Sequence, residues 1–188
     1  MPPVTTVFSC ACVLVWLRVG LLAALLGSPT LQAAAPPVGD DWWGTVTWVV
    51  DGDTVRVRPL GSGRPVPVRL MGIDAPEICQ SGGPAARDAL KRQLMRQRVL
   101  VHSQAHDPYG RVLARLAVNG DDPAARLVAG GWVWSYQYRT GQGPYAVQQR
   151  QAEVQHLGLF AGGSPEDPAA FRKRHGACRR PGRGTGRN

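Results

Sequence analysis

From residue 43 onward, apolar and polar residues alternate with the period of two that is typical of half-buried β-strands. Trp43–Val50 is rich in β-branched and aromatic residues and predicts a first strand. Thr54–Arg58 predicts a second strand, and Val66–Met71 a third. The Gly-Ser-Gly run within Pro59–Arg64 predicts a hairpin loop between them. In the third strand, Arg69 should point away from the face that carries the valines and leucine.

After the third predicted strand, the apolar residues change to the spacing of a helix. Pro84 suits the first position of a helix. The apolar residues behind it recur at every fourth position, at Ala86, Leu90 and Leu94. Val99–His102 and Arg111–Val118 then predict two more strands, separated by a turn at His106–Gly110.

Two further helices are expected in the second half of the chain. Asp121-Asp122-Pro123 is a typical helix start, and that helix should end at Gly130-Gly131. A third helix should run from Gly143-Pro144 to Gly158, although its apolar periodicity is weak. Three strands, a helix and two closing strands are the plan of a small Greek-key barrel of the OB type. The fold class is therefore mainly β with helices, as a five-stranded OB-fold barrel with about three α-helices.

Length and charge narrow the class of partner. The chain has 188 residues, a formal net charge of +9 and a pI near 10.3, enough for one modest domain with extensions. Such an excess of positive charge suits a polyanion, either nucleic acid or an anionic membrane surface. Ordinary solubility explains the charge equally well, so the charge alone does not decide.

The N-terminal residues resemble an export signal. Val19–Leu26 is an apolar run behind Arg18, followed by helix breakers and by small residues at 33–35. We predict a signal peptide over 1–33, cleaved between Ala33 and Ala34, and a linker over 34–42. The protein would then be secreted or periplasmic. An uncleaved membrane anchor is the alternative, which is disfavoured because Arg18 leaves fewer than the roughly 18 apolar residues that a span needs.

The cysteines agree with export. Cys10 and Cys12 lie in the leader, which leaves Cys79 and Cys178 in the rest of the chain. Two cysteines in an exported protein predict one disulfide, here between the segment after Glu77 and the C-terminal region. The four histidines show no spacing typical of metal ligands.

Side chains that can bind a metal ion or a phosphate lie where the predicted strands end. Asp53 and Asp74 offer hard oxygen ligands for Ca²⁺ or Mg²⁺. Arg69 offers a planar fork for a phosphate, and Glu77 is a candidate proton acceptor. Each residue also has an ordinary explanation, because Asp beside Gly forms turns and Arg on a strand is often a surface charge. Requiring all these explanations at once is less economical than one site.

The motifs resemble those of thermonucleases (the staphylococcal nuclease-like family). The matching stretches follow one another in the family's order and lie within Trp43–Ala161. They are Val50-Asp-Gly-Asp-Thr-Val55, Arg69-Leu-Met-Gly-Ile-Asp-Ala-Pro-Glu77, Asp107-Pro-Tyr-Gly-Arg111 and Gly158-Leu-Phe160. The first stretch alone is a weak signal, but the set is specific.

The resemblance implies an OB-type barrel and a metal-dependent phosphodiesterase. It implies Asp53, Asp74 and the backbone carbonyl of Ala75 as Ca²⁺ ligands, with Mg²⁺ as the second candidate ion. It implies Arg69 and Arg111 as phosphate-binding residues and Glu77 as the residue that activates water. The nucleotide pocket would be lined by Tyr109, Tyr136 and Tyr138, with Tyr136 and Tyr138 divided between core and pocket. Pro108 stands where the family has a lysine, so one phosphate contact would be absent.

The sequence thus predicts a secreted, metal-dependent nuclease of low sequence specificity, acting as a monomer on single-stranded DNA, with RNA and duplex DNA as further substrates. The nuclease domain would span 43–161, followed by an extension over 162–178 and a basic, disordered tail over 179–188. The alternatives are a noncatalytic OB-fold module that binds nucleic acid and a nuclease held at a membrane by its leader.

Overall fold

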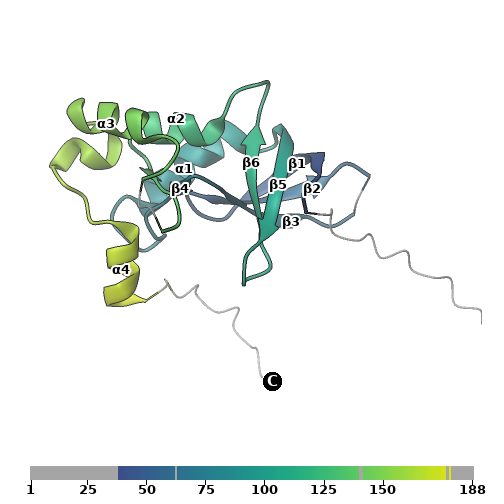
Figure 1. Cartoon of the computed structure of the whole chain (residues 1–188), viewed down its shortest axis with the longest axis horizontal. Helices are drawn as coiled ribbons and strands as arrows, with labels where there is room; N and C mark the ends of the chain where they lie inside the picture. Colours follow the sequence, from purple (N-terminus) through teal and green to yellow (C-terminus); the bar gives the residue numbers. More distant parts are fainter. Residues whose placement is uncertain (1–37, 62, 140–141, 177, 179–188) are drawn as a thin grey trace, which may run out of the picture. The chain divides into compact units, whose positions relative to one another are not determined.

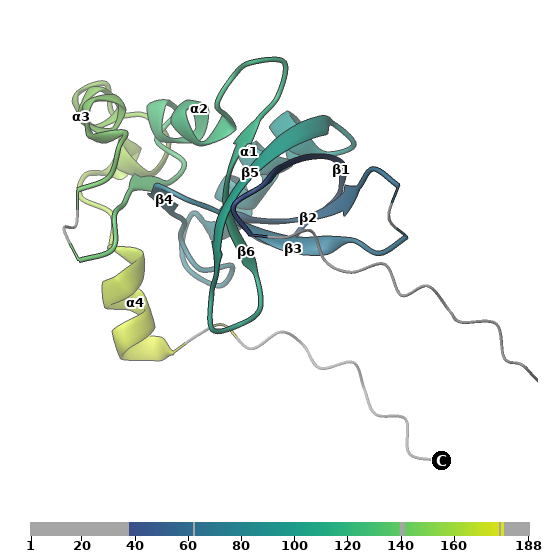
Figure 2. The ribbon, with the colours of Figure 1, turned by 45° about the vertical axis from the view of Figure 1, so that its right-hand side comes forward.

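Five strands close into a barrel in the order β1, β2, β3, β6, β5 (Figures 1 and 2). They are β1 (Asp41–Val49), β2 (Thr54–Pro59), β3 (Val66–Leu70), β5 (Arg98–His106) and β6 (Val112–Ala117). The pairs are antiparallel except β3 with β6, which is parallel. This arrangement confirms the five-stranded barrel predicted from the alternation.

The computed structural model describes residues 38–61, 63–139, 142–176 and 178. The predicted signal peptide and basic tail, and residues 34–37 of the predicted linker, lie outside these residues. Among the described residues, no helix has both the length and the apolar character needed to cross a membrane.

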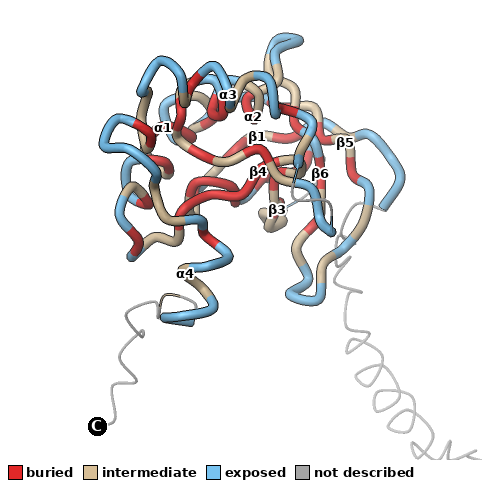
Figure 3. The backbone as a smooth tube through the Cα atoms, turned by 60° about the vertical axis from the view of Figure 1, so that its left-hand side comes forward, coloured by how far each residue is buried: buried red, intermediate tan, exposed pale blue. Residues whose placement is uncertain are grey.

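The barrel interior is filled by the apolar half of each alternating strand. Val46, Val55, Val57, Val99 and Val101 are fully buried there. Figure 3 shows buried residues of the labelled strands β1 and β5 in red. Arg69 lies on the opposite face of β3 from buried Val68 and Leu70, as the alternation predicted. β-Branched side chains pack well on such a pleated surface, which explains why valine dominates this core.

Helix α1 (Gly83–Leu94) packs onto the same core. Its residues Ala86, Leu90 and Leu94 are completely buried, so the predicted fourth-position spacing is the face that meets the barrel. Helix α2 (Pro123–Ala129) begins where expected, because the Asp122 carboxylate accepts hydrogen bonds from the backbone N–H groups of Ala124 and Ala125.

Several elements differ from the prediction. Strand β5 is longer than Val99–His102, and α3 (Ala146–Val154) is shorter than its predicted span and is followed by a 3₁₀ helix, η1 (Gly158–Gly162). The two-residue strands β4 (Ile73–Asp74) and β7 (Trp134–Ser135) pair with each other. Such short strands depend on tertiary pairing and carry no periodic signal.

A fourth α-helix, α4 (Pro168–His175), lies in the predicted C-terminal extension. It starts at Asp167, whose carboxylate accepts a hydrogen bond from Ala170 N–H. Most of its residues are exposed, as the pale blue colour in Figure 3 shows. Because a mostly exposed helix of eight residues has little apolar periodicity, the sequence pattern did not predict it.

Candidate active site

A close approach at Gly52 brings the β1–β2 turn against the segment that follows β4. A Cβ atom at Gly52 would lie 2.7 Å from the Cβ of Ala75 and 2.9 Å from the Cβ of Ala86. Glycine is therefore required between Asp51 and Asp53 for packing. The approach lets Ala75 N–H donate a hydrogen bond to Asp53 Oδ2 at 3.2 Å, which joins two parts of the chain 22 residues apart.

Asp53 and Asp74 converge on one guanidinium group. Arg69 Nη2 lies 3.1 Å from Asp53 Oδ2 and 3.0 Å from Asp74 Oδ1. The other terminal nitrogen, Nη1, donates to the carbonyl oxygens of Leu70 and Ile73, which fixes the orientation of the group. Asp53 and Asp74 are both buried. Two buried carboxylates that face the same point are a strong attractor for a cation.

The pKa values of the acidic groups reflect this crowding. Burial, together with the charge of Asp53 beside it, raises the pKa of Asp51 to about 7. Burial also raises the pKa of Asp74, even though hydrogen bonds and charge from Arg172 and Arg69 act in the opposite direction. Burial is the first cause in both groups, so both carboxyl groups are harder to ionise here than in water.

Arg111 reaches the same pocket from the turn before β6. Its Nε donates to Asp107 Oδ2 at 2.6 Å, and its Nη1 donates to the Thr54 hydroxyl at 3.3 Å. Asp107 Oδ1 also accepts from the backbone N–H groups of Tyr109 and Arg111. Asp107 thus holds both the turn and the guanidinium, with the ring of Tyr109 5.5 Å from the Arg111 Cζ atom.

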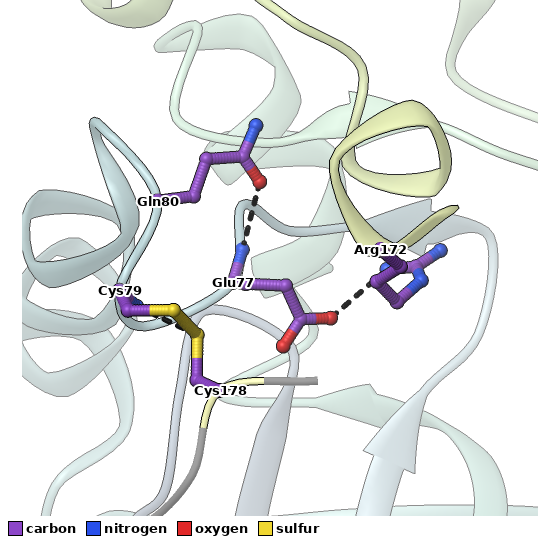
Figure 4. Close-up of a disulfide and its surroundings, with 5 residues drawn as sticks. All are labelled: Glu77, Cys79, Gln80, Arg172 and Cys178. Carbon is purple, nitrogen blue, oxygen red and sulfur yellow. Dashed lines mark hydrogen bonds and ion pairs between the residues drawn. A yellow bond between two sulfur atoms is a disulfide. The ribbon is translucent and has the colours of Figure 1, made fainter. Parts of the chain in front are cut away.

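Glu77 lies at the rim, where its backbone N–H donates to Gln80 Oε1 at 3.1 Å. Its Oε1 accepts a hydrogen bond from Arg172 Nη1 at 3.2 Å (Figure 4). The Glu77 side chain is partly accessible, so a water molecule can reach it.

Arg172 of α4 is a site residue that the sequence analysis did not predict. Besides Glu77, it contacts Asp74 with both terminal nitrogens, at 3.3 Å to Oδ1 and 2.8 Å to Oδ2. The guanidinium therefore spans the predicted metal ligand and the predicted base. Both carboxylates raise its pKa, although burial acts against them.

The expected disulfide between Cys79 and Cys178 is present and holds α4 near this site. Figure 4 shows the bridge on one side of Glu77 and Arg172 on the other. Gln80 adds a second tie, because its Nε2 donates to the carbonyl oxygen of Glu166 at 2.7 Å. The predicted disulfide was the available signal for Arg172, since it links the neighbourhood of Glu77 to a segment that carries an arginine six positions before Cys178.

These groups line one pocket of about 590 Å³. Its charged lining consists of Asp51, Asp53, Asp74, Glu77, Arg56, Arg69, Arg111 and Arg172. Ala75 and Tyr109 also line it, and Tyr109 is 84% exposed. The lining does not include Tyr136 or Tyr138, of which Tyr138 is 74% exposed and stacks against Arg139.

The donor chemistry fits a divalent cation. Within the described ranges, no group of three or more His, Cys, Asp and Glu side chains is arranged to hold a metal ion. Asp53 and Asp74 nonetheless present convergent carboxylate oxygens to a positively charged nitrogen, and Ala75 lies directly beside them. Hard cations such as Ca²⁺ complete their coordination with carbonyl oxygens, water and substrate, so two carboxylates are compatible with such a site.

Comparison with known proteins identifies relatives. The family model described as "Staphylococcal nuclease homologue" matches residues 67–161, which include Arg69, Asp74, Glu77 and Arg111. A protein of Escherichia coli named "Protein ParB" is 32% identical over 150 residues, covering 74% of this chain and 84% of its own length. An "Uncharacterized endonuclease" of Escherichia coli is 33% identical over 140 residues, with 74% and 90% covered. The "Micrococcal nuclease" of Shigella flexneri is 30% identical over 165 residues, with 81% and 94% covered.

Proposed function

Because this chain belongs to the family of staphylococcal nuclease homologues and is therefore a phosphodiester-hydrolysing enzyme, we propose that it is an exported, Ca²⁺-dependent nuclease. Its substrate would be DNA, foremost single-stranded, with RNA as a second substrate and little sequence preference. The observation that carries this proposal is the convergence of Asp53 and Asp74 on one cationic nitrogen, in a pocket with Glu77 and three further arginines.

The arginines would bind the phosphate. Attack on a phosphodiester adds negative charge to oxygens that already carry one, and preorganised guanidiniums offset that charge. Arg69 and Arg111 have their positions defined by backbone carbonyls and by Asp107, respectively. Such positioning lowers the reorganisation needed during the reaction. Loss of one such donor typically costs about 3–4 kcal/mol of transition-state stabilisation.

Glu77 would accept the proton of the attacking water. It is partly exposed at the rim, and general bases of this kind contribute roughly 10²–10⁴-fold to the rate. A divalent cation at Asp53, Asp74 and the Ala75 carbonyl would act as a Lewis acid on the phosphate and lower the pKa of bound water. We favour Ca²⁺ over Mg²⁺ because two carboxylates and a carbonyl suit a flexible, oxygen-rich site.

Arg172 contacts the same Asp74 carboxylate that would bind the cation. Its nitrogens contact both Asp74 oxygens, so cation binding at Asp74 requires that Arg172 release at least one of them. The released guanidinium would remain tethered near the pocket and could contribute to phosphate binding in place of the lysine that Pro108 replaces.

The proposal is tested by incubating the purified full chain with single-stranded DNA, first with a chelator and then with Ca²⁺ or Mg²⁺ restored. We expect no cleavage in chelator and the greatest cleavage with Ca²⁺. The Glu77→Gln variant should bind DNA within about twofold of the unmodified chain but cleave it at least about 100-fold more slowly. Cleavage that persists in chelator would contradict the metal dependence, and full activity of Glu77→Gln would remove Glu77 from its role.

A further inference from the structure

Two exposed tryptophans lie among three arginines on the outer side of the barrel. This set, the Trp–Arg face, consists of Trp43, Trp48, Arg56, Arg58 and Arg98 on β1, β2 and β5. Trp48 is 60% exposed and Trp43 is 44% exposed, whereas the alternate residues of the same strands fill the core. Large aromatic side chains left in solvent beside cations require an explanation that core packing does not provide.

The strand register places these side chains next to one another. Trp48 lies opposite Arg56 across the β1–β2 pair. Thr45 of β1 lies opposite Arg58 of β2 on one side and opposite Arg98 of β5 on the other. Directly opposite residues share a face, so the arginines flank β1. Further along β1, the Arg98 Cζ atom lies 4.8 Å from the ring centroid of Trp43.

The face is continuous with the active-site pocket. Arg56 belongs to the Trp–Arg face and also lines the pocket, together with its β3 neighbour Pro67. From the level of Arg56 and Trp48, the face runs along β1 to Trp43, over roughly 15 Å at the usual rise per residue. In the direction from Trp48 to Trp43, β1 carries no acidic residue before Asp41, which lies beyond Trp43 and is paired with His102.

We propose that the Trp–Arg face binds the unpaired part of a nucleic acid strand whose scissile phosphate occupies the pocket. Bases would stack on Trp48 and Trp43, and the phosphates between them would contact Arg58 and Arg98. Aromatic rings among cations are the standard means of holding single strands without sequence preference. The inference rests on the proposed function only for the direction of the strand, since it assumes that the strand enters the pocket.

Charge favours this occupant over a second copy of the chain. In a twofold interface the same face meets itself, which would bring the arginines of one copy close to the arginines of the other. An anionic membrane would also pair with the arginines. It would not explain why the Trp–Arg face is continuous with a pocket suited to a phosphodiester.

Binding can be measured without catalysis, in chelator, by fluorescence anisotropy of a labelled oligothymidylate of about 16 nucleotides. We expect Trp48→Ala to weaken binding about tenfold, while Trp48→Phe, which keeps a stacking ring, retains most of the affinity. Arg58→Gln should lower the salt dependence of log K by about 0.7, the value for one phosphate contact of a single strand. Arg150→Gln, which removes an exposed charge from α3, is the control and should have little effect.

Substrate length separates this inference from the proposed function. With Ca²⁺ present, Trp48→Ala should lower kcat/KM for the long oligonucleotide but leave a thymidine dinucleotide unaffected, because the dinucleotide reaches only the pocket. If the unmodified chain cleaves neither substrate, the proposed function fails, whereas the anisotropy result still decides the binding face.

Several results would overturn the inference. One is unchanged oligonucleotide affinity in both Trp48→Ala and Trp43→Ala. Another is an equal loss of activity on the long and short substrates. A third is an effect of these variants on binding to vesicles of anionic lipid, or on a dimer seen by light scattering, with none on oligonucleotide binding.

Discussion

At the scale of single residues, the active site depends on side chains that hold other side chains. Asp107 is the clearest case, because it accepts two backbone hydrogen bonds and also binds the Arg111 guanidinium. The aspartate has no expected contact with substrate, yet it orients a residue that does. The motif that contains it was identified through Tyr109 and Arg111, and only the structure revealed the role of its first residue.

The pKa of Asp107 leads to a pH prediction. Although burial acts to raise that pKa, the hydrogen bonds from Arg111 and Tyr109 lower it below the ordinary value of 3.8. A carboxylate whose pKa is depressed in the folded state stabilises the fold above its unfolded pKa, and this contribution disappears as the pH falls through the folded value. We expect Asp107→Asn to destabilise the protein by about 2 kcal/mol at pH 7.

Thermal melts in chelator from neutral to acidic pH check this prediction. The Tm difference between the unmodified chain and Asp107→Asn should be constant near neutrality. It should shrink as the pH falls below 3.8, the ordinary pKa of the carboxyl group, and onward through the lower value that this group has in the folded protein. Asp88→Asn on α1 is a suitable control because Asp88 pairs only with its exposed neighbour Arg87 among the contacts described. A Tm difference that stays unchanged at low pH would contradict the assignment.

At the scale of elements, α4 is the part of the chain that links the C-terminal extension to catalysis. It buries little of its own surface and carries Arg172 to Asp74 and Glu77. A helix with so few apolar contacts is held mainly by its ties to the site and by the disulfide. Its position should therefore respond to whatever else binds Asp74.

Competition between Arg172 and a divalent cation can be measured directly. Arg172→Gln removes a guanidinium from both Asp74 oxygens, so we expect Ca²⁺ to bind about tenfold more tightly, which corresponds to about 1.4 kcal/mol. Calorimetric titration of the DNA-free protein measures this affinity without reference to activity. Lys173→Gln removes the same charge from the same helix and should leave the affinity unchanged. Equal affinities in all three proteins would exclude competition.

The disulfide should act through the same residue. A tether keeps Arg172 at a high effective concentration beside Asp74, and its removal lowers that concentration. We expect the Cys79→Ser/Cys178→Ser variant to bind Ca²⁺ more tightly, and the addition of Arg172→Gln to produce little further change. Hydrogen exchange should increase in residues 166–176 while the barrel strands stay protected, because their core does not include α4. Independent, additive effects on affinity would show that the bridge does not act through Arg172.

At the scale of the whole molecule, the net charge and the disulfide are both consistent with a nuclease that works outside the cytosol. A net charge of +9 favours long-range attraction of nucleic acid, and a disulfide is stable in an oxidising environment. We predict that the full chain, expressed in a bacterium with a periplasm, is recovered outside the cytosol with an N-terminus at Ala34. N-terminal sequencing of the soluble fraction measures this, and recovery of the intact chain in membranes would favour the anchored alternative.

Much of the barrel was predictable because its signals are local. Alternation in Thr54–Arg58, fourth-position spacing in Ala86–Leu94 and the start of α2 at Asp122 each depend on a few neighbouring residues. The short strands β4 and β7 were missed because two residues carry no period. Helix α4 was missed because an exposed helix needs no apolar stripe.

By itself, the sequence determined the barrel and the residues that strand ends bring to one edge, including Asp53, Arg69 and Asp74. Period-two alternation and a glycine between two aspartates constrain the backbone over short distances, so they can be read without coordinates. Only the tertiary structure decided that Arg172, 98 residues from Asp74, lies against that carboxylate and that Trp48 stands beside Arg56. Such contacts depend on the register of paired strands and on how a distant segment packs, and neither leaves a periodic trace along the chain.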